Sequence, residues 1–329
     1  MIMTPNWLSL HIHYNSDPFW LLTETIDPLI AKLSEQRLLA NYFFVRYWEQ
    51  GPHIRLRLLP TQADAAPTLL QTVGSRVEQF LARRPSIFKF PSMYMSDNFK
   101  ELFIEEYGEA ALYRKYGPQG LIPFERNNSI RQVDYEPEFE RYGGATGTAI
   151  AERYFEASSA ITLQVLGGQN GHDFRIVLGQ AFRFFLYVCL TFFEGAERAS
   201  FAAAYQRQWA QFGGKKSPST LSDFAYKYGR QRDFLDDALS ACEDVLAGRV
   251  TPVPVEAAWI AALHRLKASL AEAGANGDIV VPEERGGLAG YVRYLLPSYV
   301  HMHNNRLGLA ISDEVYLAYL ADQAFTHHV

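Results

Sequence analysis

The 329-residue sequence has few cysteines and no excess of positive charge. Its two cysteines, Cys189 and Cys242, lie far apart in helix-like stretches. Such a pair is typical of buried thiols, so we do not expect a disulfide framework. The formal net charge is −5 and the pI is about 6.0. A broad basic surface is therefore missing, and direct nucleic-acid binding is not expected.

Long hydrophobic runs are also lacking. The most apolar stretch, residues 181–193, is too short to span a bilayer and contains Arg183. Residues 1–20 do not combine a basic head with an apolar run, as a secretory signal would. These absences predict a soluble, cytoplasmic protein that does not bind a membrane.

Motifs for nucleotide, nucleophile and metal chemistry are missing as well. The chain has no phosphate loop, no G-x-S-x-G, no H-E-x-x-H and no C-x-x-C. His301 and His303 would point to nearly opposite sides of a helix. His11 and His13 could share a strand face, but no third ligand is placed beside them. We therefore expect neither a metal nor an organic cofactor.

What the sequence does contain is 48% hydrophobic residues, enough for a large core. Alternation predicts a strand over 7–14, and two β-rich runs flank Gln50-Gly51-Pro52 as a hairpin. A further strand is predicted over 130–139. Helices are predicted over 19–36, with an interruption near Pro28, and over 62–83. Residues 86–134 are too long for an ordinary connection and are interpreted as an insertion with some structure of its own.

Beyond residue 145 the pattern becomes helical, with loops predicted over 212–220 and 273–287. The predicted helices cover residues 147–165, 173–194, 197–212, 219–247, 255–273, 286–309 and 313–325. Strands followed by helices indicate an α+β fold. We expect antiparallel β-sheet elements with a hairpin in 1–144 and a mainly helical part in 145–329. Since the strands must bury one face, both parts are expected to form one fused domain.

The predicted hairpin carries three arginines. A turn centred on Gln50-Gly51 would place Arg46 opposite Arg55, Phe44 opposite Arg57 and Trp48 opposite His53. These six side chains would then share one face of the ribbon, opening to a cleft. Like charges directly opposite each other are unfavourable, so this face predicts a compensating anion. Pairing with structural carboxylates, or simple solvation, explains the arginines equally well from spacing alone.

Two further stretches carry polar candidates. "YEPEFERYGG" (135–144) ends in two glycines, and a sharp turn there would project Arg141 and Tyr142. In "PSYVHMHNNRLG" (297–308), Pro297 suits the first turn of a helix. Helical spacing puts Ser298, His301 and Asn305 on one stripe. Taken singly, a strand-end arginine and a hydrogen-bonded helical histidine are the more common interpretations.

Taken together, "YFFVRYWEQGPHIRLRL", "YEPEFERYGG" and "HMHNNRLG" resemble the C-terminal elimination domain of class I lanthipeptide dehydratases. The same domain occurs as stand-alone thiopeptide-type bacteriocin biosynthesis proteins. The three motifs span residues 42–308, which is most of the chain. The insertion at 86–134 departs from the core pattern of the domain.

The resemblance implies that the protein removes glutamate from glutamylated Ser or Thr of a precursor peptide, leaving dehydroalanine or dehydrobutyrine. It implies a separate glutamylating dehydratase as partner, and no cofactor. Glutamate binding carries over onto Arg55, Arg57 and Arg141, and the catalytic role onto His301. The hairpin and helix patterns add Arg46, His53, Tyr142, Ser298 and Asn305 as candidate substrate-binding residues. Arginine forks match carboxylates, and a histidine near neutral pH can move the proton.

Two alternatives stay open. Some relatives are pyridine synthases, which join two dehydroalanines in a formal [4+2] cycloaddition and expel the leader peptide; these need no glutamate pocket. A non-catalytic scaffold that presents the precursor peptide is the second alternative. The sequence does not decide whether the chain forms a homodimer.

Overall fold

The computed structural model describes residues 6–90, 92–212 and 221–327, without the side chains of 221–223. The chain divides into two compact units, Pro5–Glu136 and Pro137–Val329. We call these the sheet unit and the helical unit. The change of character expected near residue 145 is thus found slightly earlier. That the two units act as one fused domain stays a prediction. The predicted loop at 212–220 lies, apart from residue 212, outside the described residues.

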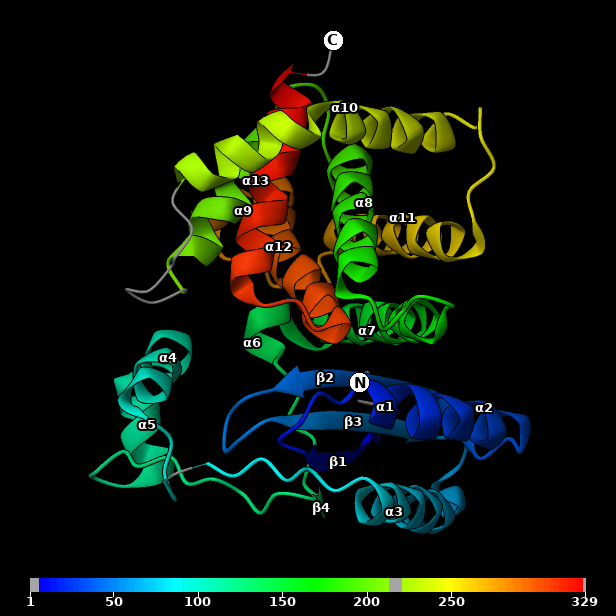
Figure 1. Cartoon of the computed structure of the whole chain (residues 1–329), viewed down its shortest axis with the longest axis vertical. Coiled ribbons are helices and arrows are strands. Elements are labelled where there is room, and N and C mark those ends of the chain that lie inside the picture. Colours follow the sequence, from blue (N-terminus) through cyan, green and yellow to red (C-terminus); the bar gives the residue numbers. More distant parts are fainter. Residues whose placement is uncertain (1–5, 91, 213–220, 328–329) are drawn as a thin grey trace. The chain divides into compact units, whose positions relative to one another are not determined.

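The sheet unit contains one antiparallel sheet in the order β2-β3-β1-β4 (Figure 1). The predicted first strand and hairpin are confirmed, and the last strand begins where expected but ends early. The strands are β1 (Leu8–His13), β2 (Leu39–Tyr47), β3 (His53–Pro60) and β4 (Ser129–Gln132). The α+β prediction, with antiparallel strands before helices, is therefore confirmed.

One face of this sheet is apolar. Leu10, Ile12, Ile54 and Leu56 are at most 4% exposed, and their register places them on the same side. The next residue of that face, Tyr14, packs against Phe80 of α3. Two helices cover the sheet, because α2 (Asp27–Glu35) contacts β2 and α3 (Ala66–Arg83) contacts β1 and β4. The core therefore lies on one face of the sheet, and the polar side chains of β1 and β3 lie on the opposite face.

Helix formation around Pro28 follows the prediction of an interrupted helix. A short α1 (Phe19–Leu21) passes through a π-helical turn, Leu22–Ile26, before α2 begins at Asp27. Pro28 then lies in the first turn of α2, directly after the π-helical turn, and its missing N–H cannot continue the ladder of i→i−4 hydrogen bonds.

The predicted insertion has its own small core. It contains α4 (Asp97–Tyr107) and α5 (Glu109–Tyr116), whose buried residues pack with the residues before and after them. Trp48, at the hairpin turn, stacks on Phe99 of α4 with ring centroids 5.6 Å apart. The insertion is therefore anchored to the hairpin. Its buried core residues are Met95, Phe103, Leu112 and Ile122.

The helical unit contains the helices predicted beyond residue 145. After a short α6 (Phe139–Tyr142), they are α7 (Gly144–Gly167), α8 (Phe174–Phe192), α9 (Glu197–Ala210), α10 (Leu221–Leu246), α11 (Pro254–Ala275), α12 (Leu288–Leu307) and α13 (Ile311–His327) (Figure 1). Pro297 does not begin a helix but lies inside α12. The helix therefore runs backward past Tyr294.

Helix α8 is long and apolar enough, by length and composition, to cross a membrane, although half of its most apolar window is buried. Arg183 lies within it and pairs with Glu256 of α11 at 2.6 Å. An ion pair to a neighbouring helix, with contacts to α10, α11, α12 and α13, is typical of a core helix. A cytoplasmic location stays a prediction.

Candidate active site

The hairpin register differs from the predicted one by one residue. Arg46 faces Ile54, whereas Val45 faces Arg55 and Phe43 faces Arg57. The connection comprises residues 48–52, and its centre is Gln50 rather than the Gln50-Gly51 bond. Both of these residues have positive φ, +65° and +103°. Because side chains alternate along a strand, a shift of one residue moves every partner to the other face.

Arg46 therefore does not share a face with Arg55 and Arg57, and that part of the prediction is wrong. Its guanidinium lies 3.6 Å from the Asp17 carboxylate, on the face of the sheet that carries the apolar core. Burial lowers the pKa of Arg46, and the Asp17 charge partly offsets this. A structural ion pair accounts for this arginine.

Arg55 contacts three side chains of the sheet unit. Its Nε donates to Nε2 of His53 at 3.3 Å, and its Nη2 lies 3.4 Å from Glu49 Oε2. The guanidinium carbon lies 3.3 Å from the centre of the Tyr47 ring. His53 in turn uses Nδ1–H to bond the Gly51 carbonyl at 2.9 Å, which leaves Nε2 as the acceptor. Arg55 and His53 are therefore mutually fixed.

Glu49, which sequence reasoning missed, is a buried carboxylate that joins the hairpin to the insertion. It is 3% exposed, and Lys115 Nζ lies 2.7 Å from its Oε1. The Tyr116 hydroxyl donates to the same oxygen. With Arg55 on Oε2, this buried charge has three partners, as a desolvated carboxylate requires. The turn that carries Glu49 is closed by a hydrogen bond from the Gly51 N–H to the Trp48 carbonyl at 2.9 Å.

Arg57 is different. It is 7% exposed and stands opposite Ser9 of β1. Its guanidinium carbon lies 5.4 Å from the Tyr135 ring centre. Burial first, and the Arg55 charge second, lower the pKa of Arg57 to about 10, so it stays charged at neutral pH. A buried cation beside a second cation favours an anion nearby.

Three histidines lie on the face of Arg55 and Arg57. The predicted common face of His11 and His13 is confirmed, and His53 joins them with ring centroids 4.8 and 4.5 Å away. Burial is the largest cause that lowers their pKa values, to about 2 for His11, 4 for His13 and 3 for His53. All three are neutral at pH 7. Within the described residues, no group of three or more His, Cys, Asp or Glu could hold a metal ion.

In the helical unit, the R-Y-G-G turn is packed against α12. Gly143 has φ +79°, and a Cβ there would lie 2.7 Å from the Tyr291 hydroxyl. That hydroxyl donates to the Arg141 carbonyl at 3.3 Å. The Tyr142 hydroxyl lies 3.4 Å from Ser298 Oγ. The turn therefore places Tyr142 beside Ser298 of the predicted polar stripe, whereas the Arg141 side chain pairs with Glu138 at 3.1 Å.

His301, one turn beyond Ser298, is bound to a carboxylate that sequence reasoning missed. Its Nδ1 lies 2.8 Å from Oε1 of Glu314 on α13, and Glu314 is 1% exposed. The other oxygen accepts from Asn304 Nδ2 at 3.1 Å and from the Tyr205 hydroxyl. Burial raises the pKa of Tyr205 well above its usual value, so this hydroxyl remains a donor.

Glu314 fixes which nitrogen of His301 can react. Because a carboxylate oxygen accepts, Nδ1 carries the hydrogen and Nε2 holds the lone pair. Trp209 stacks on the imidazole with centroids 4.0 Å apart, which holds the ring plane. The His301 side chain keeps 20% of its surface exposed. An imidazole held in this way is able to act as a general base.

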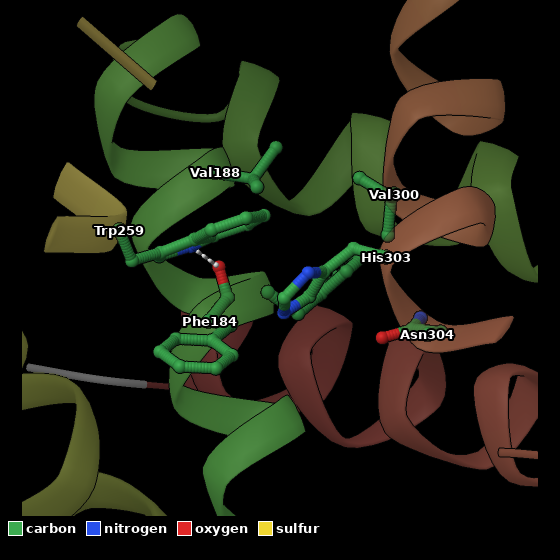
Figure 2. Close-up of a pocket in the computed structure, with 7 residues that line it drawn as sticks. Phe184, Val188, Trp259, Val300, His303 and Asn304 are labelled. Atoms are coloured by element: carbon green, nitrogen blue, oxygen red, sulfur yellow. Dashed lines mark hydrogen bonds between the residues drawn. The ribbon is translucent and has the colours of Figure 1, made fainter. Parts of the chain in front are cut away.

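His303 lies on the other side of α12, as its spacing predicts. Its ring packs against both Trp259 and Phe184 (Figure 2), with centroids 4.1 Å and 5.1 Å away. Its Nδ1 contacts Ser158 Oγ at 2.8 Å, and burial lowers its pKa well below the usual value. The space among these side chains is too small for a water molecule. His303 is thus a core residue, whereas its neighbour His301 is accessible.

The predicted site residues fall into two groups. His53, Arg55 and Arg57 lie in the sheet unit, whereas Arg141, Tyr142, Ser298, His301 and the half-buried Asn305 lie in the helical unit. The joint action of the two groups on one substrate stays a prediction.

Three solved structures have a fold similar to that of this chain. The pyridine synthase TbtD from thiomuracin biosynthesis is similar over 97% of both chains, with a TM-score of 0.71 and 18% identity. TsrL is similar over 99% of this chain and 95% of its own, with a TM-score of 0.63 and 15% identity. The tRNA-dependent lantibiotic dehydratase MibB from Microbispora sp. 107891 matches 98% of this chain and 28% of its own, with a TM-score of 0.60 and 18% identity.

No curated protein matches the chain at a significant level. The family model described as the C-terminal part of lantibiotic biosynthesis dehydratases matches residues 7–325. This range includes both units, the hairpin, the R-Y-G-G turn and α12 with His301. The chain therefore belongs to the family of lantibiotic biosynthesis dehydratase C-terminal domains.

Proposed function

We propose that the protein is a lyase that eliminates glutamate from glutamylated Ser or Thr side chains of a precursor peptide. The pair formed by His301 and the buried Glu314 carries the proposal. β-Elimination needs a base at the Cα–H bond, and Nε2 of His301 has the free lone pair. As the proton moves to Nε2, the Glu314 carboxylate stabilises the imidazolium that forms.

The electrons of the Cα–H bond form the Cα=Cβ double bond, and the Cβ–O bond breaks. The ester oxygen leaves with the glutamate as a carboxylate. Arginine is suited to receive it, since its planar fork bonds both oxygens and stays charged. Arg57, buried and charged in the sheet unit, supports this part of the proposal. Arg141, on the turn that contacts α12, is a second candidate cation.

The proposed partners are a precursor peptide with leader and core, and a separate dehydratase that attaches glutamate. The family itself belongs to lanthipeptide and thiopeptide biosynthesis. MibB is named a tRNA-dependent dehydratase, and this chain matches only 28% of it. The proposed reaction needs a glutamylated peptide, so we infer that glutamylation precedes this step.

Pyridine synthesis is the second candidate, and two observations favour it. Arg46 lies on the other face of the sheet, and Arg55 is engaged by Glu49. Fewer cations than expected are thus available for glutamate. The structural match to the pyridine synthase TbtD also covers 97% of both chains. His301 would serve that reaction too, since it requires proton transfers.

A direct assay separates the candidates. The protein is incubated with a peptide that carries glutamyl-Ser, and free glutamate and peptide mass are followed. Elimination predicts one glutamate released per dehydroalanine formed, with a final mass one water below that of the unmodified Ser peptide. The second substrate is a peptide with two dehydroalanines. Conversion of that peptide to a pyridine macrocycle, with no glutamate released from the first, would replace elimination by cycloaddition.

A further inference from the structure

Four buried polar atoms lie on the polar face of the sheet without a hydrogen-bond partner among the described residues. They are Ser9 Oγ, His11 Nε2, His13 Nδ1 and Arg57 Nη1. Buried polar groups are almost always paired, because an orphaned donor loses its bond to water and gains nothing. Ser9 and Arg57 are 2% and 7% exposed, so ordinary bulk solvation does not explain them. A cluster of unpaired polar atoms on one face indicates that a hydrogen-bonding partner is missing.

The unpaired atoms lie along β1 and β3, on the face that carries both Arg55 and Arg57. Ser9 stands directly opposite Arg57, and His11 stands opposite Arg55 on the same face. Arg55, by contrast, already bonds His53 and Glu49 and stacks on Tyr47. Arg55 therefore has protein partners at Nε and Nη2, whereas Nη1 of Arg57 is buried and has no hydrogen-bond partner among the described residues. The two arginines have different tasks.

An anion with two or more acceptor oxygens matches the donors on this face. Ser9 Oγ–H, Arg57 Nη1–H and an Nε2–H on a neutral His11 are three donors. The stacking of His11 on His53, at 4.8 Å and 30°, fixes its ring plane. His13 is four residues from Ser9, about 13 Å along a strand, and so is beyond reach of the same carboxylate. A single carboxylate has enough acceptor sites for Ser9, His11 and Arg57 together.

We propose that Ser9, His11 and Arg57 form a three-donor site for a carboxylate of the departing glutamate, and that Arg55 is a positioning residue that holds the face in shape. This inference rests on the proposed glutamate elimination. Ser9 and His11 belong to β1, which lies outside the three motifs of the resemblance.

Calorimetric titration with free L-glutamate tests the site without requiring turnover. Ser9→Ala and His11→Phe each remove one donor, and each should weaken glutamate binding about tenfold. His11→Phe keeps a flat ring on His53. Ser129→Ala and His13→Phe are the matched controls, because both lie on the same face, away from Arg57. Both should bind within about twofold of the wild type. Thermal melting of each variant checks folding.

The outcomes separate this inference from the reaction. A wild type that eliminates glutamate while Ser9→Ala and His11→Phe bind it normally overturns the site and leaves the reaction standing. A wild type that binds glutamate through Ser9 and His11 but does not release it from a glutamylated peptide supports the site and overturns the reaction. Equal weakening by His13→Phe, or no glutamate binding by the wild type and only an ordered water at these atoms in a crystal soaked with glutamate, also overturns the site.

Discussion

The polar face of the sheet unit and the polar stripe of α12 in the helical unit use histidine in opposite ways. His11, His13 and His53 are buried beside arginines, and burial keeps them neutral. His301 is partly exposed and bonded to the buried carboxylate of Glu314. The first environment suits neutral hydrogen bonding to an anion, and the second suits proton transfer. The surroundings of each histidine, rather than its type, indicate its task.

The largest expected effect tests the helical side of this comparison. His301→Ala removes the base, so elimination should slow about 10²–10⁴-fold, the usual contribution of a general base. Rates of glutamate release under saturating peptide measure it. His264→Ala, an exposed histidine on α11, is the control and should act as the wild type. A loss below tenfold for His301→Ala would make His301 a structural residue.

The next effect tests the two arginines against each other. Arg57→Lys should weaken glutamate binding about a hundredfold, because an ammonium cannot reproduce the planar fork at a carboxylate. Arg55→Lys should weaken it about tenfold or less, through loss of its stacking on Tyr47 and its bond to His53. Calorimetry on both proteins measures the difference. If the order of the two variants is reversed, Arg55 is the residue that binds glutamate.

A smaller effect is expected for Glu314, which orients His301 but does not itself take the proton from the substrate. Glu314→Gln keeps the shape of the side chain but removes the charge that stabilises the imidazolium. We expect kcat to fall about tenfold to thirtyfold, a typical cost of removing a group that orients a ligand or base, with KM unchanged. Glu272→Gln, exposed on α11, is the control. A rise in KM with normal kcat would show instead that Glu314 acts on substrate binding.

The smallest effect tests the neutrality of the sheet histidines. The pKa of His13 is about 4 in the folded protein, below its value of 6.5 in the unfolded chain, so the unfolded chain binds the proton more readily. Its contribution to stability is therefore complete above pH 6.5 and is lost as pH falls toward 4. Between pH 6.5 and 5.5 the wild type should lose about 1 kcal/mol more than His13→Gln.

Urea unfolding of both proteins at the two pH values measures this difference, and the subtraction removes the contribution of every other titrating group. Equal losses of unfolding free energy in the two proteins would mean that folding does not lower the pKa of His13.

Much of the architecture could be predicted from local pattern. Alternation over 7–14 and 3.6-residue periodicity beyond residue 145 predicted β1 and the long helices, because each pattern buries one face. The separation of His301 from His303 also followed from helical geometry alone. The hairpin existed where expected, but its register did not follow, since a five-residue connection and a two-residue turn both fit Gln50-Gly51.

The sequence alone determined the types of residue available for chemistry and the fold class. Short motifs were enough to identify four candidate residues, because each motif extends over only a few positions of the chain. These residues are Arg55, Arg57, Arg141 and His301. Only the tertiary structure decided which of them has a partner. Glu314 lies 13 residues beyond His301 on the next helix, and Ser9 reaches Arg57 by strand pairing across 48 residues. Such long-range pairing cannot be predicted from spacing along the chain, because the pairing depends on which buried faces pack together.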